Sequence, residues 1–132
     1  MRITSGSLKG RKLVSPGVRN LRLTEAKVRK AIFDILADSI EGSSVLELFA
    51  GSGALGIEAF SRGAGEVTFV DNNPRCIETI RENIPQEFRE KSYIIEHHWV
   101  DDLDNAALDK LQLISRKRYG DTGLTLLRFR AL

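Results

Sequence analysis

Between residues 24 and 97, short apolar runs alternate with segments in which apolar residues recur at helical spacing. The apolar runs predict buried strands at 44–49, 66–70 and 92–97. The helical spacing predicts helices at 25–41, 55–62 and 74–83, the first with Thr24 as N-cap and the last with Pro74 in its first turn. This alternation predicts an α/β fold with a mostly parallel, doubly wound sheet and right-handed crossovers.

The two ends of the chain carry patterns typical of hairpins. At the amino end, residues 2–5 and 11–14 flank a turn that contains glycine, which predicts a short antiparallel pair. At the other end, residues 111–117 and 124–129 flank a tight turn, which predicts an antiparallel hairpin at a sheet edge. The charged segment 86–91 is expected to be a connection.

Composition adds limits to this picture without changing it. The 132 residues are 42% hydrophobic and 29% charged, as in an ordinary globular domain, but the chain is short for a full doubly wound sheet. Cys76 is the only cysteine, so no internal disulfide is expected and a reducing cytoplasm is favoured. No apolar run is long enough to span a bilayer and no signal-peptide core is present, so we expect a soluble, cytoplasmic protein.

Charge is unevenly distributed, although the formal net charge is only +2. The first 23 residues contain no acid and six cations, which are Arg2, Lys9, Arg11, Lys12, Arg19 and Arg22. Such an arm fits contact with nucleic-acid phosphates, because each neutralised phosphate releases counterions. The alternative is a solvated flap whose charges only maintain solubility.

A glycine loop follows the first predicted strand. Gly51 and Gly53 allow the backbone to turn sharply and to approach a ligand, and Gly56 allows the next helix to pack closely on its strand. Asp71, at the end of the second predicted strand, lies 20 residues after Gly51, where a carboxylate can accept hydrogen bonds from a ribose diol. The pattern predicts a cofactor that contains a nucleoside.

Glu47 helps to separate the possible cofactors. A carboxylate at the end of the first strand would repel the pyrophosphate of NAD and attract the ammonium and sulfonium groups of S-adenosylmethionine. We therefore expect S-adenosylmethionine. NAD, and a purely structural use of the glycines, stay open as alternatives.

The segment after the third predicted strand contains candidate metal ligands. Imidazole and carboxylate ligands are available there from His97, His98, Asp101, Asp102 and Asp104. Their spacing fits no common ligand motif, and adjacent histidines at a strand end point to opposite faces. We expect no metal, and acids at this place are typical of a helix start.

Three segments together resemble the RsmD-type family of bacterial small-subunit rRNA guanine-N2 methyltransferases. They are the basic arm with V-R-K-A-I-F-D-I-L at 28–36, the loop L-E-L-F-A-G-S-G-A-L-G-I-E-A at 46–59, and R-Y-G-D-T at 118–122. The resemblance implies a Rossmann-like domain over 1–132, divided into a basic hairpin at 1–23, a cofactor-binding half at 24–84 and a truncated half at 85–132.

The resemblance also implies a function. S-adenosylmethionine would donate its methyl group to the exocyclic N2 amine of a guanine in rRNA or in an assembling small ribosomal subunit. The implied cofactor residues are Glu47, Phe49, Ala50, Gly51, Ser52, Gly53, Gly56, Asp71 and Asn72. The implied RNA-binding residues are Arg2, Lys9, Arg11, Lys12 and Arg22.

The chain departs from the family in one motif. Amino methyltransferases of this kind grip the acceptor amine with Asp/Asn-Pro-Pro-Tyr/Phe, and this chain has only the isolated prolines Pro16, Pro74 and Pro85. Residues 93–97 resemble the family's fifth strand, which implies an internal deletion before them. The catalytic residues stay unidentified, and a catalytically inactive remnant that binds cofactor or RNA is the alternative. Missing strands would leave sheet edges exposed, so a homodimer is conceivable.

Overall fold

The computed structural model of the chain describes residues 1–21, 23–96, 111–119 and 122–129. Its contacts divide the chain into two compact units, Met1–His98 and Trp99–Leu132. Each unit is described by itself.

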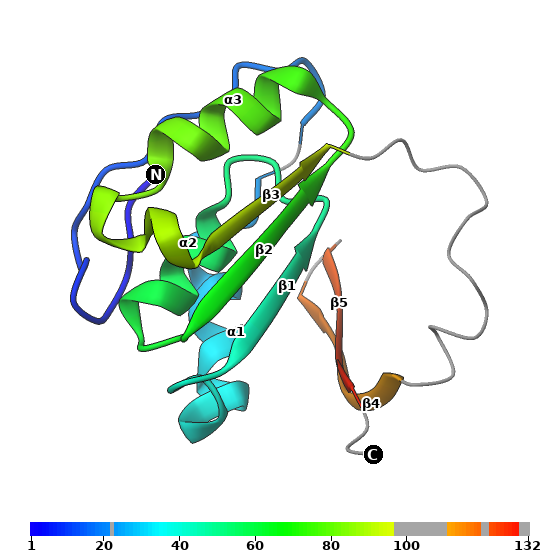
Figure 1. The fold of residues 1–132 in the computed structure, drawn as a ribbon. Coiled ribbons are helices and arrows are strands. Elements are labelled where there is room, and N and C mark those ends of the chain that lie inside the picture. The colour runs from blue at the N-terminus through cyan, green and yellow to red at the C-terminus, as the bar shows by residue number, and fades with distance from the viewer. Residues whose placement is uncertain (22, 97–110, 120–121, 130–132) are drawn as a thin grey trace. The chain divides into compact units, whose positions relative to one another are not determined.

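The first unit contains a parallel sheet of three strands in the order β1-β2-β3. The strands are β1 (Ser44–Leu48), β2 (Glu66–Asp71) and β3 (Ser92–Glu96). Between them lie α2 (Ala54–Ser61) and α3 (Pro74–Asn83), while α1 (Ala26–Leu36) precedes the sheet (Figure 1). Short 3-10 helices follow α1 as η1 (Ala37–Ser39) and α3 as η2 (Gln86–Lys91). The predicted α/β class with parallel strands is confirmed.

Several predicted boundaries differ from the structure by a few residues. The N-cap of α1 is Glu25 and not Thr24, whose carbonyl oxygen instead accepts a hydrogen bond from Nη1 of Arg29 at 2.8 Å. The expected connection at 86–91 folds as η2, closed by the backbone N–H of Phe88, which donates to the carbonyl of Pro85 at 3.0 Å.

Strand β3 lies beside β2. Its residues pair in parallel with β2, with Thr68 opposite Tyr93, and not with β1. The segment therefore forms the third strand of consecutive β-α-β units in this structure. Its resemblance in sequence to the family's fifth strand stays a prediction. A crossover through α3 and η2 brings the chain back beside β2, which is the normal result of a right-handed connection.

Helix α2 packs on the sheet at very short range, because Gly56 has no side chain. A Cβ atom at this position would lie 2.3 Å from Cε1 of Phe69 on β2. Ile57 and Phe60 of α2 are buried, and Phe60 stacks on Phe88 of η2 with ring centroids 4.6 Å apart. The role predicted for Gly56 in helix packing is confirmed.

Helices pack on one face of this sheet, and apolar side chains are exposed on the other. Contacts with β1, β2 and β3 come from α2 and α3, which lie with α1 on one side of the sheet in Figure 1. Apolar side chains on the other face of the edge strands are exposed, at 49% for Leu46, 41% for Leu48, 52% for Tyr93 and 45% for Ile95. A parallel sheet normally has both faces covered, and within the described residues of the first unit this apolar face lacks such a cover.

Within the amino-terminal arm, residues 1–17 contain a narrow antiparallel pair. The paired residues are Arg2 and Lys12, and the backbone N–H of Ile3 donates to the carbonyl of Arg11 at 3.0 Å. The pairing is a single bridge, shorter than the predicted hairpin strands. Ile3 and Leu13 are buried, so the arm packs against the first unit through its apolar positions.

The second unit contains β4 (Leu111–Tyr119) and β5 (Thr122–Phe129), paired antiparallel with Tyr119 opposite Thr122. The predicted antiparallel pairing is confirmed, but the two strands form a two-stranded sheet of their own and not an edge of the parallel sheet. Over the described part of the chain, no helix has the length and apolarity needed to cross a membrane.

Candidate cofactor-binding site and basic arm

The loop between β1 and α2 has a backbone that few sequences could adopt. Phe49, Gly51 and Gly53 have positive φ angles of 55°, 59° and 78°. Glycine adopts such angles without strain, which explains the two glycines. For Phe49, which has a bulky side chain, a positive φ costs roughly 1–3 kcal/mol of backbone strain. Such strain is concentrated at functional sites.

Asp71 fixes this loop from the end of β2. Its Oδ2 atom accepts a hydrogen bond from the backbone N–H of Gly51 at 2.9 Å, and its Oδ1 atom accepts one from the N–H of Asn73 at 2.9 Å. The carboxyl group is buried, with 6% of the residue exposed. Burial, and then the neighbouring Asp71, raise the pKa of the Cys76 thiol to about 11, so this thiol stays neutral.

The side chain of Glu47, from β1, reaches the amino end of α2. Its Oε2 atom accepts a hydrogen bond from the backbone N–H of Gly56 at 2.8 Å, and the N–H of Leu55 also contributes. Burial raises the pKa of Glu47 to about 8, although these two N–H groups act in the opposite direction. In the free protein at pH 7 the side chain is therefore mainly a neutral carboxylic acid, and not the carboxylate that the sequence argument assumed.

A cavity of about 240 Å³ lies against this loop. Five of the predicted cofactor residues line it, namely Glu47, Phe49, Ala50, Gly51 and Ser52. The rest of its wall, which the sequence argument missed, consists of Leu21, Leu23, Thr24, Leu48, Ala54 and Leu55. The cavity is smaller than the roughly 300–1,000 Å³ typical of whole ligand pockets, so it suits one part of a nucleoside cofactor.

The other predicted cofactor residues are outside that lining. Gly53 and Gly56 serve the turn and the helix packing, and Asp71 holds Gly51. Asn72 follows β2 with an exposed side chain. Their contact with a cofactor stays a prediction.

Buried polar groups of the helices hold the basic arm. Glu58 in α2 is fully buried and accepts hydrogen bonds from the backbone N–H of Thr4 at 3.0 Å and of Ser5 at 3.2 Å. Arg29 in α1 is 1% exposed and donates from Nη2 to the carbonyl of Arg2 at 2.6 Å. Burial lowers the pKa of Arg29, and the charges of Glu58 and Glu47 oppose this shift.

The arm presents its cationic side chains to solvent. Those of Arg2, Lys9, Arg11 and Lys12 are exposed, and Nη1 of Arg2 donates to the carbonyl of Gly10 at 2.7 Å. Arg22 lies outside the described residues. A backbone fixed by buried groups and a solvent-facing set of cations make the arm a preformed basic surface, and RNA contact stays a prediction.

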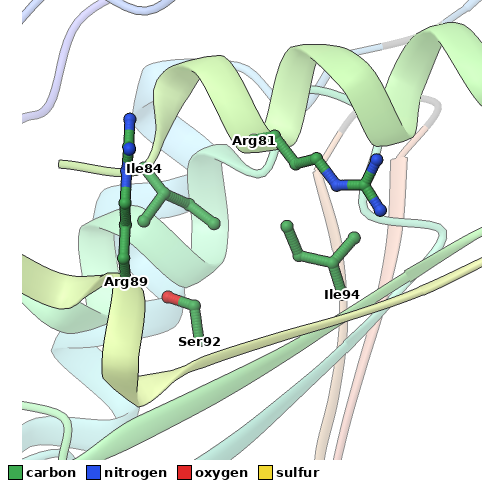
Figure 2. A pocket seen from close by; sticks show the side chains of 5 residues that line it. All are labelled: Arg81, Ile84, Arg89, Ser92 and Ile94. Atoms are coloured by element: carbon green, nitrogen blue, oxygen red, sulfur yellow. The ribbon is translucent and has the colours of Figure 1, made fainter. Parts of the chain in front are cut away.

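A second cavity, of about 330 Å³, lies between α3, η2 and β3 (Figure 2). It is lined by Arg81, Ile84, Arg89, Ser92 and Ile94. Two of these residues are arginines and none is acidic, but among the described residues no buried polar group, and in the sequence no predicted motif, points to a ligand here. We assign no ligand to this cavity.

No cluster of metal-binding side chains occurs among the described residues. The histidines and acids considered at 97–104 lie outside them.

Comparison with known proteins relates the chain to a family. A family model described as Conserved hypothetical protein 95 matches residues 1–114. The chain belongs to this family. Its members include proteins named ribosomal RNA small subunit methyltransferase D, which confirms the RsmD-type resemblance.

The sequence relatives match part of their own length. Bacillus subtilis YlbH is 44% identical over 84 residues, which cover 64% of this chain and 46% of YlbH. Ribosomal RNA small subunit methyltransferase D of Escherichia coli K12 is 39% identical over 84 residues, covering 64% of this chain and 42% of that protein. The chain spans just under half the length of these curated relatives.

Solved structures share the fold. Escherichia coli yhhF matches with a TM-score of 0.78 at 22% identity, over 100% of this chain and 99% of that chain. The C-terminal domain of precorrin-6Y C5,15-methyltransferase from Rhodobacter capsulatus matches with a TM-score of 0.55 at 12% identity, over 80% and 85%. At these identities the likeness shows the fold alone, which is a Rossmann-like methyltransferase fold.

Proposed function

We propose that this chain binds S-adenosylmethionine in the loop between β1 and α2, as part of an rRNA methyltransferase that acts on the small ribosomal subunit. The observation that carries the proposal is the position of Glu47, which lines the cavity beside the strained loop. Within the family function, the finer proposal is methyl transfer to N2 of a guanine.

The hydrogen bonds of Glu47 favour S-adenosylmethionine over NAD. In dinucleotide-binding folds the pyrophosphate binds to the free N–H groups at the amino end of the helix after the first strand. Here the Glu47 carboxyl group already accepts from the N–H groups of Gly56 and Leu55. A pyrophosphate would have to displace it. The sulfonium and ammonium of S-adenosylmethionine instead meet a carboxyl group that can ionise beside them.

Two groups of residues have proposed roles toward the cofactor. Phe49, Ala50, Gly51 and Ser52 form the wall that its nucleoside part would contact, and Leu21 and Leu23 add apolar surface. Asp71 keeps the loop in shape through Gly51 and retains lone pairs that a ribose hydroxyl could share. Asn72, exposed next to it, is proposed to face the adenosine.

The basic arm is proposed to bind rRNA through Arg2, Lys9, Arg11, Lys12 and Arg22. Support comes from the exposure of the first four and from the names of the relatives, which are rRNA methyltransferases. The Pro-Pro motif that would activate the acceptor amine is not in this sequence. We therefore propose that the 132-residue chain binds cofactor and RNA but transfers methyl groups weakly or not at all by itself.

Calorimetric titration tests the cofactor half. We expect saturable binding of S-adenosylmethionine and no binding of NAD under the same conditions. A wild-type chain that binds NAD, or that gives no heat with S-adenosylmethionine while folded, would contradict the proposal. Labelled methyl transfer to undermethylated small-subunit rRNA tests the catalytic half, and signal well above a no-protein control would overturn the weak activity that we expect.

RNA binding is tested by a matched pair of double variants. Arg11→Ala with Lys12→Ala removes two cations from the arm, and Arg81→Ala with Arg89→Ala removes two from the second cavity. We expect the arm variant alone to weaken rRNA binding and to reduce the slope of log affinity against log salt by about 1.5. Equal effects of both pairs would show that overall charge, and not the arm, governs binding.

A further inference from the structure

Asn83, the last residue of α3, connects the basic arm to the cofactor loop. Its Oδ1 atom accepts a hydrogen bond from the backbone N–H of Val14 in the arm at 2.7 Å. Its Nδ2 atom donates to the carbonyl of Val14 at 2.9 Å and to the carbonyl of Ser52 at 2.9 Å. One buried amide thus holds both backbone groups of an arm residue and one carbonyl of the loop.

The orientation of this amide follows from its partners. Two carbonyl oxygens require the two N–H donors of the amide, and the N–H of Val14 requires its oxygen. Only 3% of Asn83 is exposed, so water cannot easily replace a lost partner. Breaking one of these bonds leaves a buried group unpaired, at a cost of about 1–3 kcal/mol.

On the loop side, Asn83 complements Asp71. Asp71 accepts the N–H of Gly51, and Asn83 donates to the carbonyl of the next residue, Ser52. Both loop residues line the cavity. Together the two side chains fix the orientation of this part of the loop, and one of these two supports is shared with the arm.

We propose that Asn83 is a positioning residue that couples the two proposed binding surfaces, so that rRNA on the arm strengthens cofactor binding at the loop. The inference rests on the proposed function. RNA that holds the arm keeps Val14 on Asn83, and Asn83 then keeps the Ser52 carbonyl in its binding orientation. By thermodynamic linkage, the cofactor must strengthen RNA binding by the same factor.

Two substitutions at one arm position test this coupling in the full chain. In Val14→Pro, the proline has no backbone N–H, so the hydrogen bond from residue 14 to Oδ1 of Asn83 is lost. Val14→Ala keeps this hydrogen bond. Val14 is 46% exposed and outside the cavity lining, so neither variant removes much packing. Circular dichroism and thermal melting establish that each variant is folded.

The first measurement needs no ligand. Amide hydrogen exchange, followed by NMR, should be about fivefold or more faster at Gly51 and Gly53 in Val14→Pro than in Val14→Ala, since the loop loses a support. Equal exchange in the two folded variants would overturn the proposal, whether or not the chain binds S-adenosylmethionine.

The second measurement reads the coupling itself. In the wild type and in Val14→Ala, a small-subunit rRNA fragment should lower the Kd for S-adenosylmethionine by about fivefold or more. In Val14→Pro the fragment should have no effect on that Kd. A wild type without cofactor binding would refute the proposed function, and the exchange comparison would still decide the coupling.

Asn83→Leu tests the coupling from the other partner, because it keeps a similar side-chain volume and removes all three hydrogen bonds. It should show the same fast loop exchange and the same loss of RNA dependence as Val14→Pro. Failure of both variants to fold would overturn the proposal, because Asn83 would then be a residue of the structural core rather than a link between two sites.

Discussion

At the scale of single residues, the protonation state of Glu47 should control binding at the proposed cofactor site. Burial raises its pKa to about 8, and cofactor cations would favour the ionised form. The apparent affinity for S-adenosylmethionine should therefore rise with pH, because a larger fraction of the free protein already carries the charge. Between pH 7 and pH 9 that fraction increases about tenfold for a pKa near 8, and so should the affinity measured by calorimetry.

Glu47→Gln is the control for this pH dependence. It keeps the shape and a hydrogen-bond acceptor for Gly56, but it cannot ionise. The amino group of the ligand titrates equally in both proteins, so the difference between them isolates the carboxyl group. A wild-type affinity that follows the same pH curve as Glu47→Gln would mean that Glu47 does not meet the cation.

At the scale of elements, the close approach of the arm to α2 requires a glycine at one position. Gly6 has a φ of 82°, and a Cβ atom there would lie 1.9 Å from the carbonyl oxygen of Ser61. Gly10 has nearly the same φ, 85°, with nothing within 4 Å of its Cβ position. Gly6→Ala and Gly10→Ala therefore share the backbone cost and differ in the clash.

Urea unfolding measures that difference. Gly10→Ala should lower the free energy of unfolding by about 1 kcal/mol, for the positive φ alone. Gly6→Ala should lose at least about 2 kcal/mol more, since the arm must move away from α2 and release its hydrogen bonds. If the two variants are equally stable, the arm is not held against α2 as the structure has it.

Local patterns were enough to predict most elements and the shape of the loop. The strands β1 to β3, the three helices and the carboxyl-terminal hairpin follow from apolar spacing and turn residues. The need for glycine at 51, 53 and 56 also follows, because positive φ and close packing exclude side chains there. These features depend on interactions between residues near in sequence or on one residue's geometry.

Contacts between distant segments could not be predicted in the same way. Asn83 is hydrogen-bonded to Val14, 69 positions away in the sequence, and to Ser52, 31 positions away. No pattern of residue spacing predicts these contacts. The neutral state of Glu47 depends on burial by several elements at once. The place of β3 in the sheet is set by its pairing with β2, and the apolar sequence of a strand does not specify which strand it pairs with.

At the scale of the whole molecule, the sheet of the first unit exposes an apolar face among its described residues. Leu46 of β1 and Tyr93 of β3 lie in one row across the sheet through Thr68, and Leu48 and Ile95 lie in the next such row. Such a patch usually marks an interaction site. We expect the chain to form a homodimer through this face, which sedimentation equilibrium should reveal as a mass that increases with concentration.

Charges placed on the face should prevent that association. Leu46→Glu with Tyr93→Glu puts two carboxylates in one row, and burying them against a second copy would cost several kcal/mol. Val14→Glu is the matched control, because Val14 is exposed to a similar extent but lies in the arm. The double variant should sediment as a monomer and the control as the wild type does. A monomeric wild type at high concentration, or equal dissociation by Val14→Glu, would show that the face does not join two copies.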